Sequence, residues 1–268
     1  MTDKTKTKNL LALFISLIVG TTLWSCSRTG EASVTSHGTR DTAEQVVSLS
    51  RQPSVKVAVV VDQSASRTWT RTPTLRPEDL MILIDLVEGR GGEIGLGLIR
   101  DDSNRSLVRL WIDPPPQAPP PLDMNGNPFL LLEERSRYEQ RTERYRLSRE
   151  TWQQESGTRV KAFLAASDPL LGPTRQSMRS DVWGALRRAD AFLAEDQAAW
   201  GGSANRWAVL ITDGEDNVSE PVASLASNAR LLVVNGSGFA GKLARLQPIQ
   251  FESVDGALRH LVAEERTR

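Results

Sequence analysis

Apolar runs alternate with amphipathic segments along most of the chain. The run VKVAVVV at 55–61 is continuous and β-branched, which is typical of a parallel strand buried on both faces. Further apolar runs predict other buried strands, at 207–212, 230–235 and 249–253. Apolar positions at helical spacing predict three helices, one opening at Pro77, one over 182–194, and one from a cap at Asp255 through Ala263. Strands that alternate with helices predict a doubly wound α/β domain around a mainly parallel sheet.

A long insertion interrupts this alternation. Segments 94–100 and 106–112 predict a β-hairpin, after which 113–123 carries six prolines and predicts a stiff polyproline II spacer. A charged helix is then expected from about Leu130 to Ala166, with i,i+4 ion pairs Glu133–Arg137 and Glu155–Arg159. Large apolar residues on this helix recur every seven positions and predict a narrow stripe that packs on its own domain, at Leu131, Tyr138, Tyr145 and Trp152. We therefore expect an inserted arm at about 113–172.

The amino-terminal segment has the organisation of an export signal. Three lysines precede an uncharged apolar stretch at 10–19, which is too short for a transmembrane helix and suits a signal peptide. The tetrapeptide LWSC at 23–26 resembles the lipobox of bacterial lipoproteins, in which the cysteine is lipidated and the preceding peptide is removed. The resemblance implies a signal peptide over 1–25 and lipid attachment at Cys26, and an uncleaved signal anchor is the alternative.

A polar segment separates this signal from the body of the chain. Residues 26–54 are rich in Ser, Thr, Gly and charge and predict a flexible tether, followed by a domain over 55–262 and a short tail at 263–268. A lipid anchor implies a location on a membrane of the bacterial cell envelope. Ser27 stands where some enteric lipoproteins carry an aspartate that favours inner-membrane retention, so the outer membrane is slightly favoured in a Gram-negative host.

Charge and residue counts exclude several classes of function. Basic and acidic side chains both number 33, so no basic surplus indicates a nucleic-acid partner. The single cysteine excludes an intrachain disulfide framework and a CxxC metal site. Only two histidines are present, and no Walker or G-x-S-x-G motif appears, which argues against Ser-His-Asp hydrolysis and nucleotide hydrolysis.

A cluster of oxygen donors follows the first predicted strand. Asp62, Ser64 and Ser66 have the spacing D-x-S-x-S, and alternate residues of an extended loop share a face. In an open parallel sheet such a loop lies at the ligand-binding carboxyl edge. One carboxylate and two hydroxyls suit Mg²⁺ or Mn²⁺ better than zinc. The alternative is that Asp62 and Asp213 only cap turns or helices and bind no metal.

Together with two later segments, this motif resembles the metal-ion-dependent adhesion site of von Willebrand factor A domains. The strand at 207–212 is followed by Asp213-Gly214, similar to the strand ending in T-D-G in that family. The family threonine before a T-x-L-x-x-A-L helix corresponds here to Ser180, with Thr174 as an alternative six residues earlier. The resemblance implies a site for Mg²⁺ (or Mn²⁺) held by Asp62, Ser64, Ser66, Ser180 and, through water, Asp213.

The resemblance also implies a function. In the family one metal coordination position is left open, and an Asp or Glu carboxylate of a protein partner fills it. We therefore expect a membrane-anchored, metal-dependent adhesion or scaffold module that is not an enzyme. Two alternatives remain: a metal-assisted hydrolase, for which Glu215 and Asp216 are the nearest acid/base candidates, and a metal-free structural envelope lipoprotein.

Overall fold

The computed structural model describes residues 54–64, 72–103, 107–122, 131–172, 177–195, 204–214, 216–235 and 242–267. All of them belong to one compact unit, Leu49–Arg268. The predicted signal peptide, residues 26–53 of the predicted tether with the lipidation site Cys26, and Ser66, Thr174 and Glu215 lie outside the described residues. Ser54, the last residue of the predicted tether, is instead the first residue of a strand. No helix of the described part has the length and apolarity needed to cross a bilayer.

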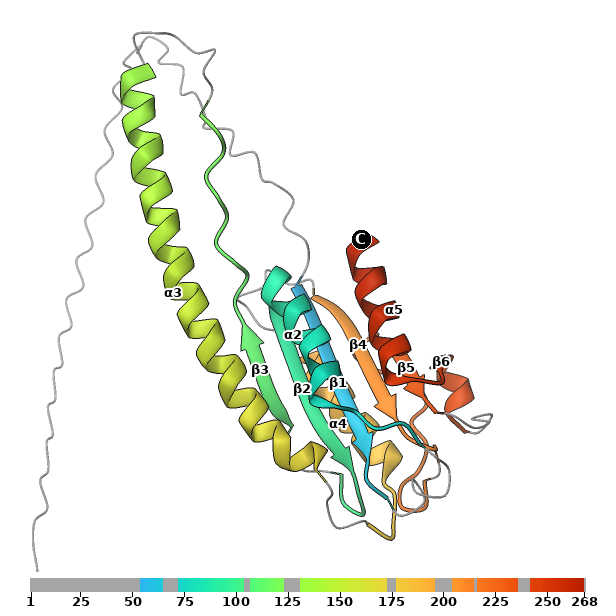
Figure 1. The fold of residues 1–268 in the computed structure, drawn as a ribbon. Coiled ribbons are helices and arrows are strands. Elements are labelled where there is room, and N and C mark those ends of the chain that lie inside the picture. Colours follow the sequence, from blue (N-terminus) through green and yellow to red (C-terminus); the bar gives the residue numbers. More distant parts are fainter. Residues whose placement is uncertain are drawn as a thin grey trace, which may run out of the picture. The chain divides into compact units, whose positions relative to one another are not determined.

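A six-stranded sheet forms the centre of the unit, in the order β3-β2-β1-β4-β5-β6 (Figure 1). All neighbouring strands are parallel except β3, which runs antiparallel to β2. The strands are β1 (Ser54–Asp62), β2 (Gly92–Ile99), β3 (Val108–Ile112), β4 (Ala204–Ile211), β5 (Arg230–Val234) and β6 (Ile249–Phe251). The predicted mixed α/β architecture with a mainly parallel sheet and one hairpin is confirmed.

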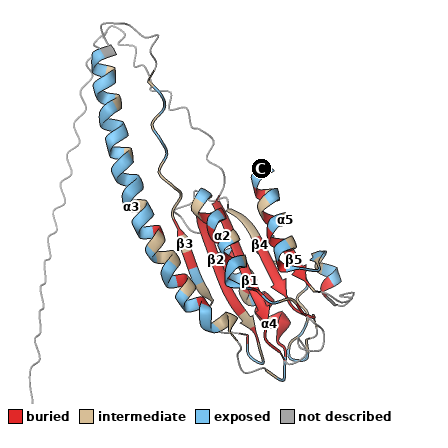
Figure 2. Cartoon of the chain, in the orientation of Figure 1, coloured by how far each residue is buried: buried red, intermediate tan, exposed pale blue. Residues whose placement is uncertain are grey.

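Helices cover both faces of this sheet, as Figure 1 shows. They are α2 (Pro77–Arg90), α3 (Leu131–Leu171), α4 (Val182–Ala194) and α5 (Val254–Thr267), with a short 3₁₀ helix at Lys242–Leu246. Alternate β1 side chains point to opposite layers: Val57 and Val59 pack with α2 and α5, whereas Ala58 and Val60 pack with α4. Every residue of β1 is buried, which explains why residues 57–61 are all apolar (Figure 2).

The last helix differs from its prediction. It begins at Val254, so Asp255 lies in its first turn, and the Ser253 hydroxyl accepts the Gly256 amide hydrogen at 3.1 Å instead. The helix also continues to Thr267 instead of ending at Ala263. Glu265 explains the extension, because its fully buried carboxylate accepts hydrogen bonds from Arg90 at 2.7 Å and from the Trp207 indole at 2.7 Å.

The insertion forms a polyproline–helix arm, defined here as residues 113–122 together with α3. The expected helix is confirmed and extended to Leu171, and both predicted ion pairs form. Residues 113–122 lie in no helix or strand and run beside α3 (Figure 1). Beyond Pro115 only every third residue is half-buried, at Pro116, Pro119 and Leu122, as three residues per turn require if one edge faces the helix.

The aromatic residues of the α3 stripe are less exposed than most of their neighbours on the helix. Tyr138, Tyr145 and Trp152 are half-buried on a helix that is otherwise mostly exposed between 132 and 155. The Trp152 indole donates a hydrogen bond to the Asp113 carbonyl oxygen at 2.8 Å. The guanidinium of Arg159 adds an ion pair with the Asp113 carboxylate at 3.1 Å. The predicted packing of the stripe on its own domain is confirmed at Trp152.

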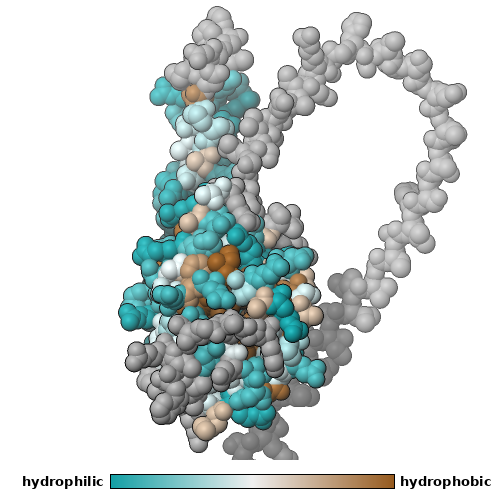
Figure 3. All heavy atoms as spheres, turned by 90° about the vertical axis from the view of Figure 1, so that its right-hand side faces the viewer, coloured by the Kyte–Doolittle hydropathy of each residue, from teal (hydrophilic) through white to brown (hydrophobic). Residues whose placement is uncertain are grey.

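One side of the molecule is mainly hydrophilic. Figure 3 shows this face with hydrophobic atoms gathered only in small areas between charged and polar side chains. Over the described part of the chain, the large hydrophobic residues that are exposed are scattered: Met81, Leu132, Leu147, Met178 and Val218. Scattered apolar residues are normal on protein surfaces and do not indicate an extensive apolar docking face.

Candidate functional site

Strands β1 and β4 bring two distant segments together at the carboxyl edge of the sheet. Val61 pairs with Ile211, so Asp62 and Thr212, the next residues, emerge side by side. The crossover after β1 leads through α2 to β2, whereas β4 follows α4 on the opposite face. The strand order therefore reverses between β1 and β4, which is where open α/β sheets bind ligands.

The Asp62 carboxylate is the centre of this edge. Its Oδ1 accepts a hydrogen bond from the Ser64 amide at 2.7 Å. Its Oδ2 accepts hydrogen bonds from the Thr212 hydroxyl at 2.7 Å and from the Ser180 hydroxyl at 3.3 Å. Two segments that lie 118 and 150 residues further along the chain thus meet at the Asp62 side chain, of which 1% is exposed.

Burial makes this carboxylate costly to ionise. It raises the pKa of Asp62, and the hydrogen bonds from Ser64 and Thr212 oppose that rise. The negative charge of Asp213 raises the pKa of Asp62 further, so the two carboxylates lie close enough to repel each other. A cation placed between hard oxygen ligands would offset both the burial and the repulsion.

Ser180 is held at the site by a second loop. The Ser180 amide donates to the Asn217 side-chain oxygen at 3.0 Å, and the Asn217 amide donates back to the Ser180 carbonyl oxygen at 3.2 Å. Asp181, the next residue, is the N-cap of α4 and accepts the Gly184 amide hydrogen at 2.9 Å. The start of α4 and the loop after β4 therefore fix each other.

The T-D-G segment after β4 has a local reason for its residues. The Thr212 hydroxyl donates to Asp62 and also accepts the Gly214 amide hydrogen at 3.0 Å. Gly214 has φ of 82°, a left-handed conformation that favours glycine. Asp213 follows with 8% of its surface exposed. This tight turn keeps Asp213 beside Asp62.

The structure gathers four of the five proposed metal ligands at this edge. Ser64 and Ser180 each donate a hydrogen bond to the Asp62 carboxylate. The charge of Asp213 raises the pKa of Asp62. Ser66 lies outside the described residues. Within the described ranges no three His, Cys, Asp or Glu side chains are grouped as a metal site. A site of two carboxylates and several hydroxyls fits Mg²⁺, which takes oxygen ligands and keeps waters.

Two structural residues of the site were not anticipated from the sequence. The sequence places Thr212 only in a strand, but its hydroxyl donates to the Asp62 carboxylate at 2.7 Å. Gln63 is the variable residue between Asp62 and Ser64 in D-x-S-x-S, but it is 5% exposed and all its polar groups are hydrogen-bonded. A polar residue between two ligands of a short loop is the only sequence signal that points to such a role.

Gln63 connects the ligand loop to the inserted arm. Its side-chain amide donates to the Leu170 carbonyl oxygen in the last turn of α3 at 2.6 Å, and its side-chain oxygen accepts from Arg100 at 2.8 Å. Its backbone carbonyl accepts the Ser177 amide hydrogen at 3.2 Å, on the segment that leads to Ser180. The side chain therefore holds Asp62 and Ser64 in place against α3 and the end of β2.

We expect Gln63→Ala to weaken Mg²⁺ binding by about 10–100-fold, as removal of groups that orient metal ligands commonly does. The substitution removes the hydrogen bonds to Leu170 and Arg100 but no ligand. Isothermal titration of the full chain with MgCl₂ measures the effect, with the exposed Gln153→Ala on α3 as the control. An unchanged affinity in Gln63→Ala would show that the loop holds its shape without this side chain.

Asp216 is occupied by backbone hydrogen bonds. Its carboxylate accepts amide hydrogens from Trp183, Val218 and Ser219, each at 2.8 Å. These contacts place Asp216, an acid/base candidate in the sequence, in the role of a residue that shapes the turn. A carboxylate that holds three amides in one geometry is poorly placed to exchange protons with a substrate.

Comparisons with known proteins do not assign the chain to a family. The sequence matches no family model, and a search of curated proteins finds no significant match.

Proposed function

We propose that the domain is a von Willebrand factor A-like module whose adhesion site binds a divalent cation and, through it, a protein partner. The observation that carries the proposal is the convergence of three separated segments on the buried Asp62 carboxylate. The order of these segments along the chain and their place at the switch point of a parallel sheet both support it.

The chain's own residues would hold the cation in defined roles. Asp62 and Asp213 supply negative charge, and Ser64, Ser66 and Ser180 supply neutral hydroxyl oxygens. When bound, Mg²⁺ (or Mn²⁺) supplies a Lewis-acidic position for a carboxylate oxygen of the partner's Asp or Glu. Two carboxylates are thin compensation for dehydrating Mg²⁺, so a third carboxylate from the partner strengthens the site.

The proposed activity is binding, not hydrolysis. A hydrolytic site needs a group that can transfer protons beside the metal. The carboxylate of Asp216 is engaged by three backbone amides, which favours a role in shaping the loop. We therefore assign the site to adhesion or scaffolding at the cell envelope.

Ser180 provides the test of this function. Ser180→Ala removes a proposed ligand oxygen and is expected to weaken Mg²⁺-dependent partner capture about tenfold, whereas Ser180→Thr retains the hydroxyl and the capture. Pull-downs with the full chain in Mg²⁺ and in EDTA measure the difference. Partner capture that is equal in EDTA, or equal between Ser180→Ala and wild type, would contradict metal-dependent adhesion.

The anchoring proposal rests on the amino-terminal sequence alone. Cys26→Ala is expected to leave a precursor that is neither lipidated nor cleaved by the lipoprotein peptidase, because the thiol is the site of both steps in the resembled lipobox. Gel mobility and metabolic labelling with a radioactive fatty acid measure the outcome, and Ser25→Ala is the control. Labelling of Cys26→Ala at the wild-type level would refute lipidation at this residue.

A further inference from the structure

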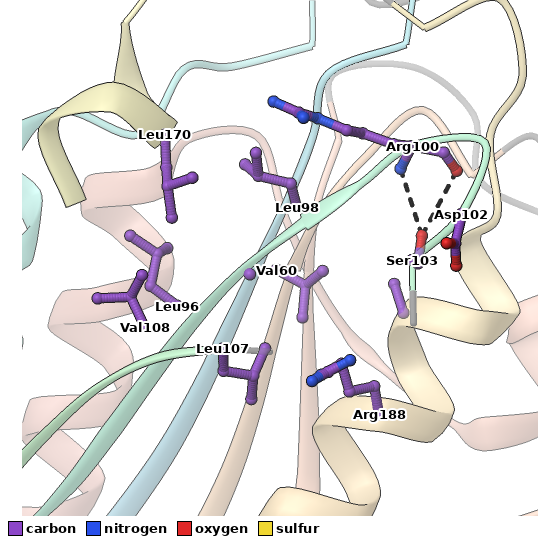
Figure 4. Close-up of a pocket in the computed structure, with 12 residues that line it drawn as sticks. Val60, Leu96, Leu98, Arg100, Asp102, Ser103, Leu107, Val108, Leu170 and Arg188 are labelled. Atoms are coloured by element: carbon purple, nitrogen blue, oxygen red, sulfur yellow. Dashed lines mark hydrogen bonds between the residues drawn. The ribbon is translucent and has the colours of Figure 1, made fainter. Parts of the chain in front are cut away.

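A pocket of about 150 Å³ lies beside the carboxyl half of β2 (Figure 4). The last ladder pair between β2 and β3 is Leu96 with Val108, so β2 continues to Ile99 beyond that pairing. Residues of β1, β2, the start of β3, the last turn of α3 and the helix α4 line the opening. The apolar wall consists of Val60, Leu96, Leu98, Leu107, Val108, Leu170 and Ala185.

The size of the pocket defines what its apolar wall can hold. A cavity of about 150 Å³ lined by aliphatic side chains is large enough for a benzene ring in a well-studied case. Gly97 contributes no side chain to the pocket, and a Cβ there would come within 2.5 Å of the Leu107 methyl carbon Cδ2. The space therefore suits one aromatic ring or one branched alkyl group.

Arg188 places a positive charge at the pocket. It extends from α4 toward Leu107 at the pocket (Figure 4), and its buried Nε has no hydrogen-bond partner. Within the described residues its guanidinium makes no hydrogen bond or ion pair. Burial and the charge of Arg109 lower the pKa of Arg188, and the negative charge of Asp102 opposes that shift.

The other polar groups of the pocket wall are already engaged. The Arg100 guanidinium donates to Gln63 at 2.8 Å. The Ser103 hydroxyl donates to the Asp181 carbonyl oxygen at 2.8 Å. Asp102 is exposed, and its negative charge acts on Arg188. Unlike Arg100, Arg188 makes no guanidinium hydrogen bond within the described residues, so its donors are left for a ligand.

A second depression adjoins the pocket at Leu107 and Arg188, and in its wall Glu195 pairs with Arg109 at 2.7 Å. Together the pocket and this depression are lined by four arginines (Arg100, Arg109, Arg187 and Arg188) and three carboxylates (Asp102, Asp181 and Glu195), so their net charge is +1. A net positive charge favours an anion near Arg188.

We propose that this pocket binds a small carboxylic acid with one aromatic or branched alkyl group. The apolar group occupies the space between Leu98, Leu107 and Ala185, and the carboxylate pairs with Arg188, where a bidentate contact is geometrically favoured. The same chemistry occurs in free acids and at a polypeptide carboxyl terminus that ends in Phe or Leu. The proposal is independent of the metal site and requires no divalent ion.

Isothermal titration of the full chain in EDTA tests the proposal with 3-phenylpropionate. We expect saturable binding, at least tenfold weaker binding of the neutral amide analogue and of propionate, and at least a tenfold loss in Arg188→Gln. The control Arg141→Gln removes an exposed arginine of the arm and leaves the affinity unchanged. Tighter binding of Gly-Gly-Phe than of 3-phenylpropionate assigns the pocket to a polypeptide carboxyl terminus.

A second variant guards against misfolding of Arg188→Gln. Leu98 is half-buried at the pocket, so Leu98→Trp fills the space without entering the fully buried core and is expected to abolish binding. Circular dichroism verifies that each variant is folded. Binding of 3-phenylpropionate that persists in either folded variant, or that propionate matches, overturns the proposal, and so does the absence of saturable binding to the wild type.

Discussion

The full chain carrying Asp62→Asn is expected to bind Mg²⁺ at least about 100-fold more weakly than wild type, which corresponds to about 3 kcal/mol. Asp62 is the residue on which all three segments of the site converge, and it supplies one of the two negative charges. The amide lacks that charge but keeps an oxygen acceptor for the Ser64 amide. The Thr212 and Ser180 hydroxyls can reverse and accept from its NH₂ group.

The fold is expected to survive this substitution. Burial raises the pKa of Asp62, so without metal its charged form is less stable in the folded chain than in the unfolded chain. That group stabilises the fold at low pH and loses its contribution as the pH rises through the raised pKa. At neutral pH, the asparagine therefore removes an unfavourable charge, whereas Asp62→Ala leaves several buried donors unpaired at about 1–3 kcal/mol each.

Isothermal titration and thermal melting with and without Mg²⁺ measure these effects. The exposed Asp85→Asn on α2 is the matched control, with the same loss of charge on a different element. Mg²⁺ affinity in Asp62→Asn within twofold of wild type would mean that the cluster is a hydrogen-bonded turn and not a metal site.

Lys56→Met is expected to destabilise the domain by about 3–5 kcal/mol, because it leaves a buried carboxylate without its main partner. Lys56 and Glu93 face each other across β1 and β2, with Nζ and Oε2 3.4 Å apart and both side chains almost fully buried. The Lys56 ammonium also donates to the Glu195 carbonyl oxygen at 2.7 Å and lies 4.5 Å from the centre of the Phe192 ring. Arg109, 3.8 Å from Glu93, is too exposed to replace it.

The matched variant is Lys56→Met with Glu93→Met. Replacing both charges by apolar groups of similar size avoids an unpaired buried ion, and such exchanges are often neutral or stabilising. The melting temperature of the single variant is expected to fall by about 6–20 °C, because each kcal/mol of lost stability lowers the Tm of a domain of this size by about 2–4 °C. If the single variant has the melting temperature of the wild type, the Glu93 carboxylate pairs with water or with Arg109 at little cost in stability.

Local sequence patterns were sufficient to predict the strands of the sheet and most of the helices that cover it. The predicted helix over 182–194 coincides with α4, because an Asp cap precedes a strongly amphipathic segment. Pro77 opens α2 and Gly91, with φ of 79°, ends it. These boundaries depend on backbone chemistry within a few residues, so they can be predicted without the rest of the fold.

The end of α5 needed the tertiary structure. Its last turn carries only charged and polar residues, which gave no reason to extend the helix beyond Ala263. In the fold Glu265 is buried among Arg90, Asn205 and Trp207, and these contacts stabilise the turn. Partners on two other elements, α2 and β4, cannot be inferred from the periodicity of α5.

The sequence by itself determined which residues stand at the ends of β1 and β4, because apolar runs that stop at Asp62 and Thr212 define those ends locally. Only the tertiary structure decided that Gln63 joins the ligand loop to the last turn of α3 and that Thr212 donates to Asp62. It also decided that Arg188 lies at a pocket, where its buried Nε has no hydrogen-bond partner among the described residues. Each of these depends on which distant segments meet. Strand order and helix placement set those meetings, and no local pattern of hydrophobic and polar residues encodes them.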